Sequence, residues 1–575
     1  MKRHIQELVE KEYDLVIVGG GIFGVCAAWD AALRGLSVAI VEKNDFCHAT
    51  SANHLKMVHG GIRYLQHADL CRIRESSRER SALLHIAPHL VRPLPIVIPT
   101  YGHGIKGKEF LRVGFVVYDL LTLDRNFGIS DPKRRIPRGH FISRREILQL
   151  FPDLCENGLT GGAVFFDGQM YNPPRLAMSF LRSAVGAGAE AANYLEVTRF
   201  LKKENRVIGV VARDILAGDQ LEIRSKAVLN TAGAWSHLLL EKTLGIQLDP
   251  KPIYSRDLAF VIPRKLSNNY GFATPLKTKD ADAVLDRGGR HIFVAPWRCS
   301  TLIGVWHVVF NRIPEEVSVT EEELQGFIDE VNEACPGFAL KLKDVSMILT
   351  GLTLFGEESK QETTKISFGK RSRLIDHKKE HNIEGLVTLM GVRATTARGK
   401  AERAIDLIFE KIENRITKSK TSVTPIYGGQ IDCFDDFLNR AIEKGPSSLS
   451  SKEMRPLVHN YGSKYQEVLK YIKENPVWVE NVGDSTVIKA EIIHAVREEM
   501  AQKLADVVFR RTDLGTGGDP GGEALRTCAE LIAEELGWDD EKTQAELEEV
   551  SVTFQRLGFL KNGRSLIKAE HVRVC

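Results

Sequence analysis

Residues 14–42 read DLVIVGGGIFGVCAAWDAALRGLSVAIVE, and this stretch decides the fold. Residues 14–18 and 37–41 are short apolar runs typical of buried strands. Between them, the small apolar residues over 22–34 predict a helix that packs closely on a sheet, and Gly35 predicts its C-terminal end. Strand, glycine turn, helix and strand within about 30 residues form the βαβ unit of an α/β protein.

The glycines of this unit match the pattern G-x-G-x-x-G at Gly19, Gly21 and Gly24. Gly19 permits the tight turn, Gly21 lets the backbone approach a pyrophosphate, and Gly24 permits close packing of helix on strand. Glu42 ends the second strand, where a carboxylate can accept hydrogen bonds from both ribose hydroxyls. The unit therefore predicts a dinucleotide site at the N-terminus of the helix.

The composition is that of an ordinary globular protein. The chain has 575 residues, a formal net charge of +3, 43% hydrophobic residues and 27% charged residues, which argues against disorder and against nucleic acid as the main partner. Nine cysteines form no C-x-x-C pair, so we expect reduced thiols, a cytoplasmic location and no metal site. We expect no membrane-spanning helix and no secretory signal, while peripheral membrane contact stays open.

Two further turns distinguish FAD from NAD. Residues 230–235 (NTAGAW, with Gly233) close a strand, and residues 391–398 (GVRATTAR, with Thr395 and Thr396) precede a helix expected over 395–413. Such a helix N-terminus can face the flavin ring and stabilise its anionic reduced form. Together with the glycine motif, these turns favour FAD as the cofactor.

The rest of the chain divides into two expected domains. Residues 12–427 form an oxidoreductase domain with FAD-binding segments at about 12–90, 190–240 and 385–420, and residues 428–575 form a helical C-terminal domain. We expect one helix over 72–84, a basic surface loop over 131–146, and further helices over 491–508 and 523–536. Strands are expected at 207–211, 227–230, 259–263, 292–295 and 301–305.

Residues 49–65, ATSANHLKMVHGGIRYL, resemble a segment of the FAD-dependent glycerol-3-phosphate dehydrogenase family. The resemblance spans nearly the whole chain, and HGGIRYL is its most specific part. It implies a mixed α/β (α+β cap) fold: a Rossmann-type FAD-binding domain, an inserted antiparallel substrate-capping sheet and a C-terminal helical domain. It also implies oxidation of a hydroxy-phosphate, glycerol-3-phosphate to dihydroxyacetone phosphate, by hydride transfer to flavin N5, with electrons passed to a quinone or another acceptor.

The resemblance assigns roles at matched positions. Arg63 and Tyr64 are implied to enter the pocket of a small anionic substrate, where an arginine can pair bidentately with a phosphate. Arg398 and Arg393 are implied to lie near the ring. The implied cofactor contacts are Gly19, Gly21, Gly24, Glu42, Thr50, Ser51, Lys56, Gly60 and Gly61.

Several positions depart from the family pattern. Thr353 stands where the family has a pocket arginine, Ala259 where it has a histidine, and Ala397 where it has a tyrosine. Arg393 replaces a lysine, and residues 304–307 read GVWH where the family has GTTD. Arg256, Asp257 and His307 are the candidates to compensate, with His307 as the candidate base.

These departures leave alternatives open. The substrate is a hydroxy-phosphate, or the same scaffold acts on an amine, an amino acid or a hydroxy acid, or the protein binds flavin without catalysis. A homodimer also stays open. Membrane contact would use the basic segment 131–146 and the tail residues Lys561, Arg564, Lys568 and Arg573.

Overall fold

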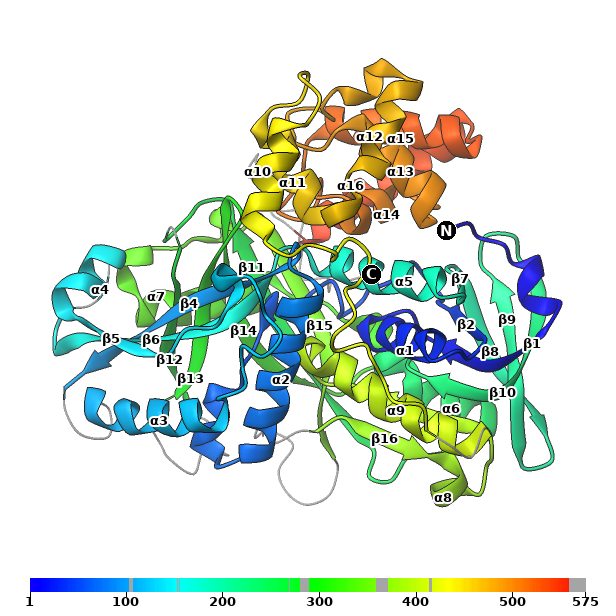
Figure 1. The fold of residues 1–575 in the computed structure, drawn as a ribbon, viewed down its shortest axis with the longest axis horizontal. Helices are drawn as coiled ribbons and strands as arrows, with labels where there is room; N and C mark the ends of the chain where they lie inside the picture. The colour runs from blue at the N-terminus through cyan, green and yellow to red at the C-terminus, as the bar shows by residue number, and fades with distance from the viewer. Residues whose placement is uncertain are drawn as a thin grey trace.

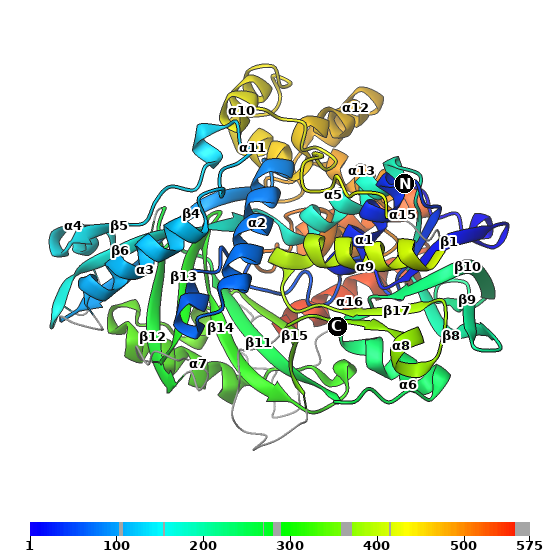
Figure 2. The ribbon, with the colours of Figure 1, turned by 60° about the horizontal axis from the view of Figure 1, so that its bottom comes forward.

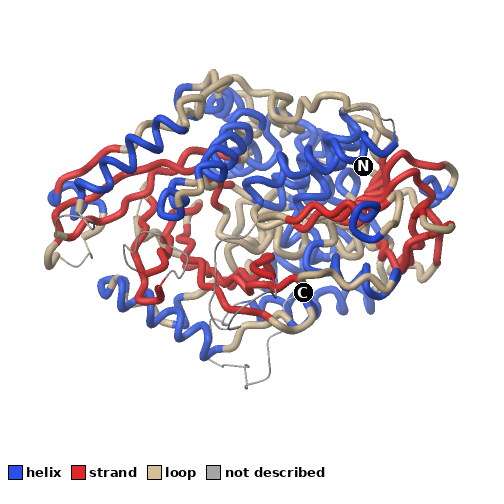
Figure 3. The backbone as a smooth tube through the Cα atoms, turned by 90° about the horizontal axis from the view of Figure 1, so that it is seen from below, coloured by secondary structure: helices blue, strands red, loops and turns tan. Residues whose placement is uncertain are grey.

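The computed structural model describes residues 1–557 apart from 103–106, 153, 155, 268, 280–288, 358–370 and 413–415. Two sheets lie side by side, and a group of helices from the C-terminal part of the chain covers one end of both (Figure 1). Seen from below, the strands separate into two groups with helices around them (Figure 3). The mixed α/β architecture with an antiparallel cap and helical C-terminal part is as expected from the sequence.

The first sheet carries the βαβ unit at its centre. Its strand order is β16-β17-β10-β1-β2-β7, with β8 and β9 attached through β10. β1 pairs in parallel with both β2 and β10, so Val18 lies beside Val41 and Asn230 at one edge. The bounds are β1 Glu12–Val18, β2 Val38–Val41, β7 Glu190–Ala192, β8 Leu195–Lys203, β9 Arg206–Asp214, β10 Gln220–Asn230, β16 Arg373–Asp376 and β17 Leu386–Met390.

Three helices cover one face of this sheet, and Figure 2 shows them in one layer above β10 and β17. They are α1 (Ile22–Leu33), α5 (Pro173–Gly186) and α9 (Ala397–Ile412). Ten of the twelve residues of α1 are buried, because the helix is enclosed by the sheet, α5 and α9. This enclosure explains the small, apolar sequence of the helix.

The second sheet is antiparallel at its centre and has the order β15-β11-β14-β13-β12-β4-β6-β3, with β5 on β6. α7 (Glu321–Ala334) packs on one face of it, away from the first sheet. The bounds are β3 Met57–Val58, β4 Val91–Tyr101, β5 His140–Ser143, β6 Leu159–Met170, β11 Pro252–Ile262, β12 Gly271–Lys279, β13 Gly289–Trp297, β14 Ser300–Phe310 and β15 Met347–Glu357.

All five strands expected after the βαβ unit are present as parts of longer strands, β9, β10, β11, β13 and β14. The helix expected over 72–84 is part of α2 (Leu70–Ile86). α3 (Lys108–Leu121), α4 (Arg144–Leu150), α6 (Ser236–Leu244) and α8 (His377–His381) are the remaining helices up to α9 in the described residues.

The segment 131–146 is not a simple surface loop. It contains a short 3-10 turn, strand β5 and the start of α4. Arg134 is buried and its guanidinium donates to the carbonyl of Val91, while Lys133 pairs with Asp435 at 2.7 Å. Intramolecular partners therefore take up these two basic groups, which the sequence leaves open for lipid. Lys561, Arg564, Lys568 and Arg573, the other residues of that prediction, lie outside the described residues.

The C-terminal part is helical, as expected, but the helix predicted over 491–508 is interrupted. α13 ends at Glu499, and Met500 adopts the left-handed conformation with φ of 54°, which no hydrophobic periodicity signals. The elements are α10 Phe434–Glu443, α11 Ser451–Tyr461, α12 Gln466–Glu474, α13 Lys489–Glu499, α14 Leu504–Asp506, a π turn Val507–Arg511, α15 Gly522–Leu536 and α16 Asp540–Leu557.

Buried ion pairs join these helices to the first sheet. Arg511 contacts both carboxylate oxygens of Asp45, at 2.6 and 2.7 Å, and Arg510 contacts the same group. Burial alone would raise the pKa of Asp45, but the charges of Arg511 and Arg510 lower it. The C-terminal helices therefore hold the loop that follows β2, where cofactor contacts are expected.

None of the helices in the described part of the chain combines the length and the hydropathy that crossing a bilayer requires.

Candidate active site

A cavity of about 1000 Å³ runs from the glycine turn after β1 to the face of the second sheet. One end is formed by the β1–α1 turn, Glu42 and residues 231–235. The other is formed by His59, residues 61–65, the turn 391–395 and strands β11, β14 and β15. The length of this cavity suits an extended cofactor with space for a small ligand beside it.

The glycine turn has the close packing that its sequence predicts. Gly19 has φ of +104°, and a Cβ there would lie 2.7 Å from the carbonyl oxygen of Thr231. A Cβ on Gly24 would lie 1.9 Å from the carbonyl oxygen of Gly19, so α1 can approach β1 only with glycine at this position. Both glycines shape the backbone, and Gly21 lines the cavity beside Ser51.

Glu42 and Ser51 fix the surroundings of this turn. Glu42 accepts hydrogen bonds from the N–H of Gly20 at 2.7 Å and from the N–H of Asn44 at 3.0 Å. Burial raises the pKa of Glu42 although these bonds act in the opposite direction. Ser51 Oγ accepts from the N–H of Ile22 at 2.9 Å, at the start of α1. The helix N-terminus therefore faces the cavity with its first turn held in place.

Most of the expected cofactor residues line this cavity: Gly19, Gly21, Glu42, Thr50, Ser51, Gly61, Gly233 and Thr395. Four others do not line it. Gly24 packs α1 on β1, Gly60 is enclosed by Arg80 and Tyr118, and Thr396 is buried beneath the turn. Lys56 lies in the wall of a second, smaller cavity of about 200 Å³, with its Nζ 4.7 Å from the ring centroid of Trp297.

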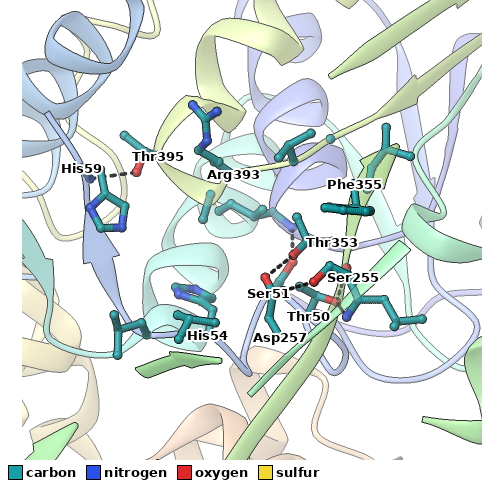
Figure 4. A pocket seen from close by; sticks show the side chains of 18 of the residues that line it. Thr50, Ser51, His54, His59, Ser255, Asp257, Thr353, Phe355, Arg393 and Thr395 are labelled. Atoms are coloured by element: carbon teal, nitrogen blue, oxygen red, sulfur yellow. Dashed lines mark hydrogen bonds between the residues drawn. The ribbon is translucent and has the colours of Figure 1, made fainter. Parts of the chain in front are cut away.

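A histidine–carboxylate pair stands on the cavity wall between the two sheets. His59 Nδ1 lies 3.2 Å from Asp167 Oδ2. The N–H of His59 donates to Thr395 Oγ1 at 3.1 Å, and Figure 4 shows these two residues. Asp167 also accepts from the N–H of Gly60 at 2.6 Å and from Arg80 at 3.1 Å. Burial opposes ionisation of Asp167, but the hydrogen bond and charge of His59, with Arg80 and Gly60, lower its pKa.

This arrangement orients the imidazole. An ionised Asp167 can only accept, so Nδ1 of His59 carries its hydrogen toward Asp167 and Nε2 is the nitrogen left for chemistry. The His59 side chain is 36% exposed, whereas that of Asp167 is 4% exposed. The pair therefore has the geometry of a base whose tautomer is set by a buried carboxylate.

Arginines gather around Tyr64 at the same end of the cavity. Gly61, with φ of +87°, turns the chain into a 3-10 segment, Ile62–His67, which brings Arg63 and Tyr64 to the cavity wall. The guanidinium of Arg393 lies 4.6 Å from the ring centroid of Tyr64, and that of Arg72 lies 5.4 Å from it. Arg72 pairs with Asp69 at 3.2 Å and does not line the cavity, so Arg63 and Arg393 are the two guanidinium groups of this cluster on its wall. Two such groups favour an anionic ligand nearby.

A second polar group lies on the face of the antiparallel sheet. Asp257 on β11 accepts from Ser255 Oγ at 2.7 Å and from Thr353 Oγ1 at 2.9 Å, and His307 Nδ1 lies 2.7 Å from it. Strand pairing places Ser255 opposite Thr353 and Asp257 opposite His307. All four residues line the cavity (Figure 4 shows Ser255, Asp257 and Thr353 together).

The other candidates lie elsewhere. Arg256 points to the opposite face of the sheet, where it pairs with Glu323 of α7, because successive residues of a strand alternate. Arg398 does not line the cavity: its guanidinium makes a two-pronged pair with Glu79 and also contacts Glu402 and Thr421. Arg398 therefore anchors α9 on α2, and the geometry gives it no contact with the reacting groups.

Sequence reasoning missed two features of this site. His59 belongs to the HGGIRYL string, but its partner Asp167 is 108 residues away on β6. The sequence offers Asp257 only as a neighbour of Ala259, and its partners come from β14 and β15. The alternation of Ser255, Arg256 and Asp257 was the signal that could have separated the two faces of β11.

Comparisons with known proteins agree with this geometry. A family described as FAD dependent oxidoreductase matches residues 14–360, and one described as C-terminal domain of alpha-glycerophosphate oxidase matches residues 419–543. The chain is 30% identical to a glycerol-3-phosphate dehydrogenase of Synechocystis over 95% of this chain and 97% of that protein. It is 31% identical to the mitochondrial glycerol-3-phosphate dehydrogenase of Homo sapiens, over 93% of this chain and 72% of that protein.

A solved structure shares the fold. The glycerol-3-phosphate dehydrogenase of Bacillus halodurans, complexed with FAD, superposes with a TM-score of 0.76 at 24% identity and covers 98% of each chain. The cavity, the glycine turn and the matched families together define an FAD-dependent oxidoreductase. Within this class, the chain belongs to the glycerol-3-phosphate dehydrogenase family.

The residues present fit FAD, which is the cofactor of this family. The glycines at 19, 21 and 24 leave a backbone surface that any Cβ at 19 or 24 would block, and Glu42 lies at the end of β2 as a ribose partner requires. The cavity continues from this turn to the N-terminus of the segment preceding α9, at Thr395. The sequence prediction of FAD is confirmed by the family match.

Proposed function

We propose that the protein oxidises a hydroxy-phosphate, with glycerol-3-phosphate to dihydroxyacetone phosphate as the reference reaction. The observation that carries the proposal is the His59–Asp167 pair, which shares one cavity with Arg63 and with the glycine turn. Bound FAD would supply the two-electron acceptor, taking hydride at N5. The oxidation also releases a hydroxyl proton, so a base beside the reacting carbon is needed.

His59 is the residue we assign to take that proton. Its Nδ1 is held by Asp167, and Asp167 is held ionised by Arg80 and the N–H of Gly60, so the imidazolium that forms is stabilised by a buried negative charge. His307, the candidate from the sequence, is held in the same way by Asp257, farther along the same antiparallel sheet. His59 is the stronger candidate because it adjoins Gly61, Arg63 and Thr395, where the cofactor turn and the arginines meet.

The arginine group provides the anion subsite. Arg63 and Arg393 both line the cavity, and the guanidinium of Arg393 lies 4.6 Å from the ring centroid of Tyr64. A phosphate dianion leaving water requires several charge-assisted donors, and two or more guanidinium groups supply them in bidentate geometry. We therefore place the phosphate at this group and the reacting carbon between it and His59.

A quinone is the acceptor we propose, and an apolar helix face supports it. On α3, Val113, Val116, Val117 and Leu120 follow helical spacing and are 63%, 56%, 38% and 64% exposed. Leu123 and Phe127, exposed by 71% and 85%, extend this surface. Val113 and Val117 also line the cavity, so the surface is continuous with its wall. A lipid bilayer is the partner that covers such a face and delivers an apolar quinone to it.

Liposome flotation tests this contact. Wild type should float with vesicles of neutral and anionic lipid, and Leu120→Glu with Leu123→Glu should reduce the bound fraction at least fivefold while flavin content stays the same. Equal flotation of the double variant would contradict the assignment. If light scattering shows a dimer that this variant dissociates, α3 is instead the contact between two copies.

A second candidate function keeps the scaffold and changes the substrate to an amine, an amino acid or another hydroxy acid. The observation that favours it is Asp257, a carboxylate on the cavity wall next to Thr353, where an arginine would be expected. Anaerobic mixing of the purified holoenzyme with glycerol-3-phosphate, an amino acid and a hydroxy acid separates the candidates. Flavin reduction by glycerol-3-phosphate supports the first, and reduction by another donor alone supports the second.

A further inference from the structure

The residues Ser255, Asp257, His307 and Thr353 form a polar group that offers hydrogen-bond acceptors to the cavity. Ser255 and Thr353 each have one hydroxyl hydrogen, and both donate it to Asp257, at 2.7 and 2.9 Å. His307 directs Nδ1 to the same carboxylate at 2.7 Å. The two hydroxyl oxygens therefore have only lone pairs left for a ligand, and the carboxylate itself is an acceptor.

This group occupies the sheet face that borders the proposed reaction centre. Asp257 and His307 are a directly opposed pair of β11 and β14, and their side chains are 23% and 19% exposed. The next strand, β13, carries Phe293, whose ring lies 5.8 Å from that of His59, and Phe293 pairs with Gly304 of β14. One continuous sheet surface therefore joins the base to the acceptor group.

The substrate part of the cavity therefore has two ends with opposite hydrogen-bonding character and charge. The arginines around Tyr64 present donors and positive charge, whereas the Asp257 group presents acceptors and a carboxylate. An anionic oxygen placed at the Asp257 group would meet lone pairs and a like charge. A hydroxyl group placed there would instead donate a hydrogen bond to a charged acceptor, which is among the stronger kinds.

We infer that Ser255, Asp257, His307 and Thr353 form a hydroxyl-selective wall that binds the uncharged, hydroxylated end of the substrate and rejects a second anionic group. The inference rests on the proposed function and refines its substrate class: a polyol with a single anionic group, its phosphate at the arginines and at least one further hydroxyl at Asp257. Such a site discriminates strongly, because a ligand lacking the donor leaves desolvated acceptors unpaired.

Three ligands test the wall. Glycerol-3-phosphate carries the terminal hydroxyl, propane-1,2-diol 1-phosphate lacks it, and 3-phosphoglycerate carries a carboxylate in its place. Affinity is measured anaerobically from the change of the flavin spectrum, and the rate of flavin reduction is recorded separately. For wild type we expect the second and third ligands to bind at least tenfold more weakly than glycerol-3-phosphate.

Substitutions in the wall test whether it causes the differences in affinity among the three ligands. Asp257→Asn should reduce the discrimination against 3-phosphoglycerate at least tenfold, because it removes the like charge. Thr353→Val keeps the charge of Asp257 and should therefore still bind 3-phosphoglycerate more weakly than glycerol-3-phosphate. This measurement remains available if Asp257→Asn does not fold. Thr350→Val is the matched control: it lies on the same strand, but it pairs with Leu258, whose side chain packs in the core on the α7 side. It should behave as wild type.

The outcomes separate the wall from the reaction. Equal affinity of wild type for all three ligands, or unchanged discrimination in Asp257→Asn, would overturn the wall, as would the absence of any spectral change. If glycerol-3-phosphate binds with the expected selectivity but does not reduce the flavin, the wall stands and the proposed oxidation fails. If it reduces the flavin without selectivity, the oxidation stands and the wall fails.

Discussion

The two ends of the cavity are built in different ways. The nucleotide end is formed by backbone from one contiguous stretch, with Gly19 and Gly24 defining its shape through the absence of a Cβ. The substrate end is formed by side chains from β6, β11, β14 and β15, which are far apart in the sequence. A cofactor site shaped by backbone therefore tolerates almost no change, whereas the substrate site can change its chemistry strand by strand.

The largest expected effect is the loss of FAD from the nucleotide end of the cavity. Gly24→Val should abolish FAD binding, because its Cβ would lie 1.9 Å from the carbonyl oxygen of Gly19 and would push α1 off the sheet. The flavin-to-protein ratio of the purified protein measures this loss. Gly186→Ala, which has open space around its added Cβ, is the control and should keep a full ratio. A yellow Gly24→Val protein would refute the role of the turn.

The next effect tests the base at the substrate end. His59→Ala should lower the rate of flavin reduction by about 10²–10⁴-fold, as removal of a general base does, with FAD still bound. The pH profile of the remaining rate should also differ from that of wild type. His140→Ala removes an exposed histidine and should leave the rate unchanged. A His59→Ala enzyme with the wild-type rate and pH profile would transfer the assignment to His307.

A smaller effect tests the anion subsite. Arg63→Ala should raise the Michaelis constant for the anionic substrate at least tenfold and leave the FAD content unchanged. The Michaelis constant of Arg63→Lys should lie between those of wild type and Arg63→Ala, because an ammonium group keeps the charge but lacks bidentate geometry. Arg138→Ala on the surface is the control. An unchanged Michaelis constant in Arg63→Ala would remove Arg63 from the pocket.

The smallest effect concerns stability beside the nucleotide end. Desolvation, with the charge of Arg298, lowers the pKa of the buried Lys56 to about 7. Between pH 7 and about 10 the unfolded chain binds more protons at this lysine than the folded chain, so its stability cost is full below pH 7 and fades as pH rises. Lys56→Met should therefore raise Tm by a few degrees at pH 7 and by less at pH 9.5.

A Tm difference that stays constant over this pH range, or grows with it, would show that Lys56 is charged and paired in the folded protein. Measurements with FAD in excess keep cofactor content from affecting the comparison.

The same contrast explains what the sequence could predict. The strand, turn and helix over 14–42 are local, so their hydrophobic pattern and glycine spacing predict both fold and cofactor. His59 was visible in its motif, but its function depends on Asp167, which β6 brings to it through sheet pairing. The break at Met500 and the ion pair that occupies Arg398 depend on tertiary packing that no local pattern records.

The departures at Thr353 and Ala259 illustrate the other limit. Their positions could be read from the resemblance, but the replacement chemistry could not, because Asp257 acts two residues away from Ala259 and across two neighbouring strands. Arg256, an equally close neighbour in sequence, faces α7 instead. A pocket assembled by strand pairing is therefore predicted only when the register is known.

Anaerobic stopped-flow mixing of the holoenzyme with glycerol-3-phosphate tests the central claim most directly, by following the flavin absorbance at about 450 nm. We expect saturable bleaching of this band in wild type and bleaching at least a hundredfold slower in His59→Ala at equal flavin content. Flavin that stays oxidised in wild type with this and every other hydroxy-phosphate would contradict it.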